Sequence, residues 1–366
     1  MFKKSLIAVC LLACAVAPVE ALPKWQQVPD PPPMPQADES GFADVNGINM
    51  FYSVYGKGNG SPILLIHGGL SSGDVWGFEV PALAETHEVI VADSRGQGRS
   101  THGLAHLTYH RMAEDYVALL AQLGLDKVTL VGWSDGGIIG IDIAIHHPKL
   151  LARLFAQAPN VTPDGLTSIP AIDPPPLSES LALDGTADPD PVVHARNRQM
   201  VRERVFRRLW ATEPNYSDQD LDDIRVPTEI VIGDHDTVIR PEHAAHIAEA
   251  IPGAKLVVLK NVGHFALLQD PKQYLKAIDE FMGEPADAAA QTSKAGQPPA
   301  AIGQYQVKAI PQAAKPPVAA QAQAASAPNA AKPPIVSAPP AMSASEDQSD
   351  ADPQTAGLAA EQGTVQ

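Results

Sequence analysis

The chain has 366 residues, a formal net charge of −16 and two cysteines. The negative charge argues against nucleic acid as a partner, because proteins bind phosphate backbones through Lys and Arg. The sequence has no P-loop, no dinucleotide-binding glycine fingerprint and no Cys/His metal-ligand spacing, so no metal and no cofactor are expected.

Residues 1–21 are predicted to be an export signal, because two lysines precede an apolar run too short to cross a bilayer. Two processing routes stay open. General signal peptidase would cut after Ala17 or Ala21, whereas the lipobox-like "LLAC" would make Cys14 a lipidated N-terminus that anchors the protein to a membrane. The expected location is the periplasm or, as a lipoprotein, the outer membrane of a bacterium. Cys10 lies here too, so the mature domain has no disulfide and no thiol nucleophile.

The two flanks of the folded part differ from it in composition. Prolines dominate residues 22–40, which predicts a semi-rigid linker. Residues 284–366 are rich in Ala, Pro, Gln and Ser and have no apolar periodicity. Such a segment cannot bury enough apolar surface to offset its ordering entropy, so disorder is expected. Residues 41–283 remain as one domain of a usual α/β size.

Strand and helix patterns alternate along this domain. Strands are expected over residues 50–56, 63–69, 87–93, 128–131, 150–159, 227–236 and 254–264. Helices are expected over residues 109–125, 138–147, 241–251 and 273–282. This alternation implies a parallel sheet, at whose strand carboxyl ends a ligand would bind.

A serine stands in the sharpest corner of this pattern, in "GWSDGG" at residues 132–137. A strand that turns directly into a helix leaves its corner residue projecting. Gly132 and Gly136, two residues before and two after, let the neighbouring backbones pass closely. This is the G-x-S-x-G elbow, which exposes a serine oxygen at the top of a sheet. It predicts Ser134 as a nucleophile, the alternative being a glycine-rich turn with an incidental serine.

Five short motifs have a familiar order and spacing. They are "HGG" at 67–69, "DSRGQGRS" at 93–100, "GWSDGG" at 132–137, "GDHD" at 233–236 and "GH" at 263–264. Together they resemble the α/β-hydrolase superfamily, in its esterase-like branch, over residues 42–282. The elbow is similar to that of valacyclovirase and enol-lactonase type serine hydrolases. The resemblance implies an α/β-hydrolase fold, which is a mostly parallel sheet flanked by helices with a small inserted cap.

The inserted cap is expected over about residues 160–223. Within it, "HARNRQMVRERVFRRLW" carries six arginines beside an apolar stripe formed by Val201, Val205 and Leu209, with Phe206 and Trp210 next to it. Two interpretations stay open. The segment is either an amphipathic cap helix with a solvated face, or a cationic rim that selects anions or faces anionic lipid headgroups.

A serine hydroxyl is a poor nucleophile at neutral pH and needs a histidine base, which a carboxylate holds in one tautomer. In the superfamily the chain order is serine, acid, histidine. The resemblance carries these roles onto Ser134, Asp236 and His264. Asp234 is the rival acid, but the family pattern places the acid three residues past the glycine of "GDHD". The rival bases lie on a loop or an exposed helix and are expected to be solvated: His235, His243 and His246.

The negative oxygen that forms during ester cleavage needs backbone N–H donors, and removing one such donor typically costs about 3–4 kcal/mol. The predicted oxyanion-hole donors are Asp135, which follows the nucleophile, and Gly69, with Leu70 as the alternative to Gly69. His67 is expected to hold the Gly69 loop by hydrogen bonding. Trp133, beside the serine, is predicted to contribute to substrate binding.

The side chain of Asp135 has two interpretations. Buried polar groups are usually paired, which favours a hydrogen bond to a neighbouring loop. Alternatively, the carboxylate faces the pocket and pairs with a cationic group of the substrate, as the resemblance to amino-acid-ester hydrolases implies.

Other polar residues are assigned structural roles. Asp93, Arg95 and Ser100 end a strand in a loop and are expected to brace it. Three spaced histidines could suggest a metal, but they straddle a loop and a helix start without candidate supporting residues, so that interpretation is set aside. They are His102, His106 and His110.

The predicted activity is cleavage of a small carboxylic ester or lactone by an exported serine hydrolase. Amide hydrolysis of the aminopeptidase or iminopeptidase kind is the enzymatic alternative, and a non-catalytic binding protein on a hydrolase fold is the other. Dehalogenase and epoxide hydrolase activities are excluded, since those branches need an aspartate where this chain has Ser134.

Overall fold

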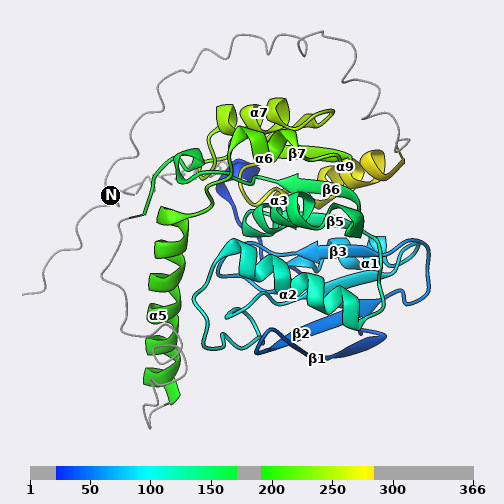
Figure 1. Ribbon diagram of the computed structural model, residues 1–366, viewed down its shortest axis with the longest axis vertical. Coiled ribbons are helices and arrows are strands. Elements are labelled where there is room, and N and C mark those ends of the chain that lie inside the picture. The colour runs from blue at the N-terminus through cyan, green and yellow to red at the C-terminus, as the bar shows by residue number, and fades with distance from the viewer. Residues whose placement is uncertain (1–21, 171–190, 284–366) are drawn as a thin grey trace, which may run out of the picture. The chain divides into compact units, whose positions relative to one another are not determined.

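The computed structural model describes residues 22–170 and 191–283. The predicted export signal at 1–21, part of the predicted cap and the predicted tail at 284–366 lie outside them. One sheet runs through the described part in the spatial order β1-β2-β4-β3-β5-β6-β7-β8 (Figure 1). Its strands are β1 (Glu39–Val45), β2 (Ile48–Tyr55), β3 (Ile63–Ile66), β4 (Val89–Ala92), β5 (Val128–Trp133), β6 (Leu151–Gln157), β7 (Thr228–Gly233) and β8 (Lys255–Leu259).

The pairs from β4 onward are parallel, and only the pairs that involve β2 are antiparallel. The α-helices are α1 (Glu79–Leu83), α2 (Tyr109–Gln122), α3 (Asp135–His146), α5 (Pro191–Thr212), α6 (Asp218–Asp222), α7 (Pro241–Ala250), α8 (Ala266–Gln269) and α9 (Pro271–Gly283). Short 3₁₀ turns are η1 (Lys24–Gln26), η2 (Gly73–Trp76), η3 (Pro148–Leu150) and η4 (Pro163–Gly165). The predicted mostly parallel sheet flanked by helices is confirmed.

Helices cover both faces of the sheet. Apolar side chains of α2, α3 and α7 form one core with one face of the strands, and those of α1, α8 and α9 form a second core with the other face. Helix α5, from the predicted cap, stands across the ends of the strands (Figure 1). Within residues 22–170 and 191–283, no helix is long and apolar enough to span a lipid bilayer.

The antiparallel edge strand β1 was absent from the sequence prediction. It pairs with β2 along its whole length through a two-residue turn at Asn46 and Gly47, whose φ angles are 46° and 76°. Two successive positive φ angles are the requirement of a type I′ hairpin turn, and Asn-Gly is the dipeptide that favours it. The "NG" between two alternating runs was therefore the signal that could have revealed β1.

The segment predicted as a linker contacts the domain near its start. Trp25 stacks on His235 with ring centroids 4.6 Å apart, and the side-chain amide of Gln269 donates to the carbonyl oxygens of Trp25 and Gln27 at 3.2 and 2.9 Å. Lys24 pairs with Asp270 at 2.7 Å. These contacts hold residues 24–27 against α8 and the loop after β7, so this stretch is part of the fold.

A buried acid lies in the core on the α1 and α9 side. Glu79 is fully buried, and among the described residues neither of its carboxyl oxygens has a hydrogen-bond partner. The indole nitrogen of Trp76 and the hydroxyl of Tyr274 lack partners in the same way. Burial disfavours the charged carboxylate and raises the pKa of Glu79 to about 8. The side chain is therefore mostly protonated at neutral pH.

This acid predicts a pH-dependent stability difference. The native state binds the Glu79 proton more tightly than the unfolded chain does, so native stability falls as pH rises through the interval from the unfolded pKa to about 8. We expect Glu79→Gln to remove this loss and to be more stable than the parent at pH 9 by on the order of 3 kcal/mol, with a much smaller difference at pH 5. Urea unfolding of parent and variant at pH 5 and pH 9 measures the difference in the free energy of unfolding. Glu85→Gln, at an exposed site, is the control. A Glu79→Gln difference that is the same at both pH values would contradict the assignment.

Candidate active site

The corner between β5 and α3 holds Ser134 in a strained backbone conformation. Its φ is 54° and its ψ is −117°, outside the regions that a residue with a side chain prefers. Such a conformation costs about 1–3 kcal/mol and persists only where the surroundings enforce it. A Cβ atom at Gly132 would lie 2.3 Å from the Gly136 carbonyl oxygen, and one at Gly136 would lie 2.1 Å from that of Ile66. Both flanking positions therefore require glycine.

A chain of three side chains converges at this corner. The Ser134 Oγ lies 3.0 Å from His264 Nε2, and His264 Nδ1 lies 3.0 Å from Asp236 Oδ2. The second oxygen of Asp236 accepts hydrogen bonds from the backbone N–H groups of Val238 and Ile239 at 2.8 and 2.9 Å. Asp236 and His264 are both buried, at 8% and 7% exposure. The structure thus brings together the three residues predicted as nucleophile, acid and base.

The rival candidates lie elsewhere. The Asp234 carboxylate bonds the neighbouring ring of His235 at 2.7 Å, whereas the carboxylate that bonds His264 is that of Asp236. His246 pairs with Asp218 at 2.9 Å. His243 was expected to be solvated, but its Nε2 accepts a hydrogen bond from the backbone N–H of Val161 at 3.0 Å, so it holds the start of the cap segment.

Two side chains from neighbouring strands hold the His264 loop. The indole N–H of Trp133 donates to the His264 carbonyl oxygen at 2.9 Å, and the side-chain amide of Gln157 donates to the same oxygen at 3.2 Å. Trp133 is only 4% exposed, so its observed contacts are those of a support for this loop. Its contribution to substrate binding stays a prediction. The role of Gln157 was missed, although a polar residue ending the buried run 151–157 was the available signal.

His67 links the loops that follow β3 and β4. Its Nε2 accepts a hydrogen bond from the Ser94 N–H at 3.0 Å, so its Nδ1 carries the proton that is donated to the Gly68 carbonyl oxygen at 2.7 Å. Complete burial lowers the pKa of His67, which keeps the ring neutral. This geometry agrees with the expected role of holding the Gly69 loop.

The loop after β4 is braced by buried charges. The Arg95 guanidinium makes two bonds to Asp115, at 2.8 and 2.6 Å, and Ser100 Oγ donates to the Asp93 carbonyl oxygen at 2.6 Å. Burial acts to raise the pKa of Asp93, but hydrogen bonds from Arg99 and from the Gly73 N–H outweigh it and hold that pKa below its ordinary value. These contacts match the bracing role expected of the loop, and Arg99 is an addition that the sequence analysis did not single out.

The two predicted oxyanion donors lie beside the cap helix. Among the described residues, neither the backbone N–H of Gly69 nor that of Asp135 meets an acceptor. The Asp135 carboxylate is 3% exposed and accepts hydrogen bonds from the Tyr109 hydroxyl at 2.9 Å and from the Trp210 indole at 3.0 and 3.2 Å. A Cβ atom at Gly69 would lie 2.5 Å from Asp135 Oδ2 and 2.6 Å from the Trp210 ring. The Gly69 loop, the elbow and α5 therefore meet at one point.

Burial raises the pKa of Asp135 to about 6, although the hydrogen bonds from Tyr109 and Trp210 act in the opposite direction. The side chain is paired, as the first of its two interpretations expected, but its partners belong to helices α2 and α5 and not to a loop. Trp210 lies on the apolar side of α5, where Val205, Phe206 and Leu209 are buried. That side of the helix follows the predicted amphipathic pattern.

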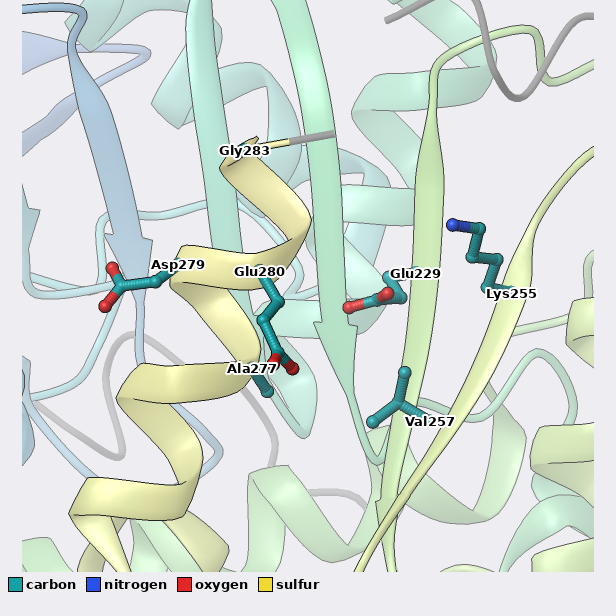
Figure 2. A pocket seen from close by; sticks show the side chains of 7 residues that line it. All are labelled: Glu229, Lys255, Val257, Ala277, Asp279, Glu280 and Gly283. Atoms are coloured by element: carbon teal, nitrogen blue, oxygen red, sulfur yellow. The ribbon is translucent and has the colours of Figure 1, made fainter. Parts of the chain in front are cut away.

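Two hollows lie at opposite ends of the sheet. One of about 390 Å³ opens beside Leu70 and Ser71, in the loop that carries Gly69, and reaches Arg202 of α5. Another of about 710 Å³ lies at the start of β7 and β8 and is lined by Glu229, Lys255 and residues of α9 (Figure 2). Since Ser134 follows the carboxyl end of β5, the second hollow lies away from the candidate site, and only the first adjoins it.

A strained serine, a histidine and a buried carboxylate therefore lie together at the carboxyl ends of parallel strands. The alpha/beta hydrolase family matches residues 63–277, which is more than half of the chain. The chain belongs to this family.

The chain is similar to hydrolases of several kinds. It is 28% identical over 258 residues to the pimeloyl-[acyl-carrier protein] methyl ester esterase of Aeromonas hydrophila, covering 64% of this chain and 100% of the relative. It is also 28% identical over 258 residues to the 2-hydroxy-6-oxo-2,4-heptadienoate hydrolase of Pseudomonas putida, covering 63% and 92%. The enol-lactonase of Burkholderia xenovorans LB400 has the same fold, with a TM-score of 0.55, 23% identity and coverage of 66% and 100%.

Proposed function

We propose that the protein is an exported serine hydrolase that cleaves small carboxylic esters or lactones through a Ser-His-Asp triad. The proposal rests on the hydrogen-bonded chain from Ser134 through His264 to Asp236, with both distances at 3.0 Å. In the first step His264 Nε2 accepts the hydroxyl proton while Ser134 Oγ attacks the ester carbonyl. The carbonyl π electrons move to oxygen and form a tetrahedral oxyanion.

The oxyanion then collapses to an acyl-enzyme. The backbone N–H groups of Asp135 and Gly69 donate to the negative oxygen, with Leu70 as the alternative to Gly69. The protonated His264 gives its proton to the leaving alkoxide as the C–O bond breaks. A water molecule, activated by the same histidine, hydrolyses the acyl-enzyme and restores Ser134. Asp236 keeps Nδ1 of the imidazole protonated throughout, so Nε2 is the atom that exchanges protons.

A panel of chromogenic esters tests the substrate class. The pimeloyl-[acyl-carrier protein] methyl ester esterase of Aeromonas hydrophila, whose full length this chain covers, supports a carboxylic ester as the substrate. We expect turnover on short acyl esters, together with stoichiometric labelling by a fluorophosphonate probe. Labelling without ester turnover, but with release of N-terminal residues from peptides, would indicate the amide hydrolase alternative. Absence of both would indicate a binding protein.

Export is proposed from residues 1–21, and Cys14 separates the two routes. In a bacterial host fed labelled fatty acid, we expect label in the protein that disappears in Cys14→Ser and persists in the matched control Cys10→Ser. An unlabelled mature chain that begins at Leu22 would identify the soluble periplasmic route. An unprocessed chain retained in the cytoplasm would contradict export.

A further inference from the structure

A cluster of two histidines and one carboxylate lies outside the candidate active site. His110 belongs to α2, whereas Asp142 and His146 lie one turn apart on α3. Asp142 Oδ1 lies 2.9 Å from His110 Nδ1 and 3.2 Å from His146 Nδ1, and the three atoms all lie within 4.8 Å of one another. We propose that these atoms bind one divalent transition-metal ion, Zn²⁺ or a metal of similar ligand preference.

The two distances from Asp142 Oδ1 to the histidine nitrogens suit a tetrahedral ion. Zinc binds imidazole nitrogen and carboxylate oxygen at about 2.0–2.2 Å, which places neighbouring ligand atoms roughly 3.3 Å apart. Without metal, the Nδ1–H of His110 donates to the carboxylate, whereas the Nδ1–H of His146 donates to the Asp142 main-chain carbonyl oxygen at 3.0 Å, with Oδ1 nearby at 3.2 Å. When the ion binds, each imidazole takes the tautomer that carries its proton on Nε2, so that the lone pair of Nδ1 turns to the metal.

The Asp142 carboxylate is held in one orientation by its surroundings. Asp142 is 1% exposed and interrupts the otherwise apolar run from Ile138 to Ile145. Its second oxygen, Oδ2, accepts a hydrogen bond from the Tyr216 hydroxyl at 2.8 Å. A hydrogen bond from a neighbouring residue that orients a ligand is the usual companion of a metal site. The two oxygens of this buried carboxylate therefore point in different directions: Oδ2 faces Tyr216, and Oδ1 faces the two histidines.

The surroundings leave room for the remaining ligand positions. The side chains of His110 and His146 are 54% and 44% exposed, so an ion can reach them from solvent. A hollow of about 310 Å³ begins at His110 and Asp142 and continues to Glu213 and Asn215. It can hold the water that completes four-coordination. Glu114 is a nearby acid, 4.0 Å from His110 Nε2, but its carboxylate is engaged by His147 at 2.6 Å.

The site would join three parts of the fold. Helices α2 and α3 supply the ligands, and Tyr216 belongs to the segment that returns from the cap helix α5. A bound ion would therefore restrain the join between the cap segment and the core helices. This role is independent of ester cleavage at Ser134, and the two proposals can fail separately.

Metal titration of the full chain, purified without a histidine tag and dialysed against a chelator, tests the site. We expect one Zn²⁺ per chain by calorimetry, a rise in Tm, and a visible cobalt absorption band when Co²⁺ replaces zinc. His110→Gln and His146→Gln should each weaken binding about 100-fold or more, and Tyr216→Phe about 10-fold. His246→Gln, a partly exposed histidine paired with Asp218, should bind as the parent does.

Circular dichroism of each variant separates loss of a ligand from loss of fold. A parent chain without stoichiometric binding would overturn the proposal, as would His110→Gln and His146→Gln variants that bind with parental affinity. In either case the cluster would be a hydrogen-bonded contact between α2 and α3 only.

Discussion

Ser134→Ala is expected to abolish ester turnover and fluorophosphonate labelling while the protein stays folded. The Ser134 Oγ is the atom that lies 3.0 Å from His264 Nε2, and no other group of the proposed mechanism can form the acyl-enzyme. Loss of the nucleophile from such a triad lowers kcat by about 10⁵–10⁶-fold. The measurement is kcat on the best chromogenic ester, with circular dichroism and Tm recorded on the same samples.

Ser40→Ala is the matched control, because this serine is exposed on the edge strand β1. It should keep full turnover and labelling. A folded Ser134→Ala protein that still turned over ester and still took up the probe would show that another residue is the nucleophile.

Asp236→Asn is expected to lower kcat by about 10⁴-fold with little change in KM. The carboxylate of Asp236 receives the Nδ1–H of His264, whereas an asparagine side chain can present an N–H to Nδ1 and favour the opposite tautomer. Nε2 would then carry the proton and could no longer accept the one from Ser134. The comparison is made at fixed pH on the same ester.

Asp234→Asn is the matched control for this experiment. It lies two residues away in the same loop and bonds His235, so its change to asparagine should alter kcat by less than about 10-fold. The opposite result, with Asp234→Asn inactive and Asp236→Asn active, would mean that the acid of the triad is wrongly assigned.

The sequence predicts most of the sheet because the buried parallel strands are continuous apolar runs, such as "ILLI" in β3. It predicts Ser134 and its flanking glycines because steric exclusion at a strand-to-helix turn leaves few residue choices. Edge strand β1 could not be found from apolar content alone, since its residues alternate between exposed and buried and follow a proline-rich stretch.

Contacts between distant segments could not be predicted where no family motif relates them. Tyr109, Asp135 and Trp210 come from three helices, and only the folded chain shows that their polar atoms meet. The same is true of His110 and Asp142, which are 32 residues apart in the chain. Spacing along the sequence grouped His110 with His102 and His106. In the folded chain, the partners of His110 lie on the next helix, α3, which follows β5.

The strained backbone at Ser134 affects which residue evolution favours at this position. Glycine populates positive φ without the steric penalty of a side chain, so replacing this serine by glycine would relieve strain of about 1–3 kcal/mol. Selection that acted only on folding stability would therefore favour glycine at this position. The proposed role of Ser134 as nucleophile supplies an opposing selection for its hydroxyl group, and a lineage that lost this chemistry would be expected to lose the serine early.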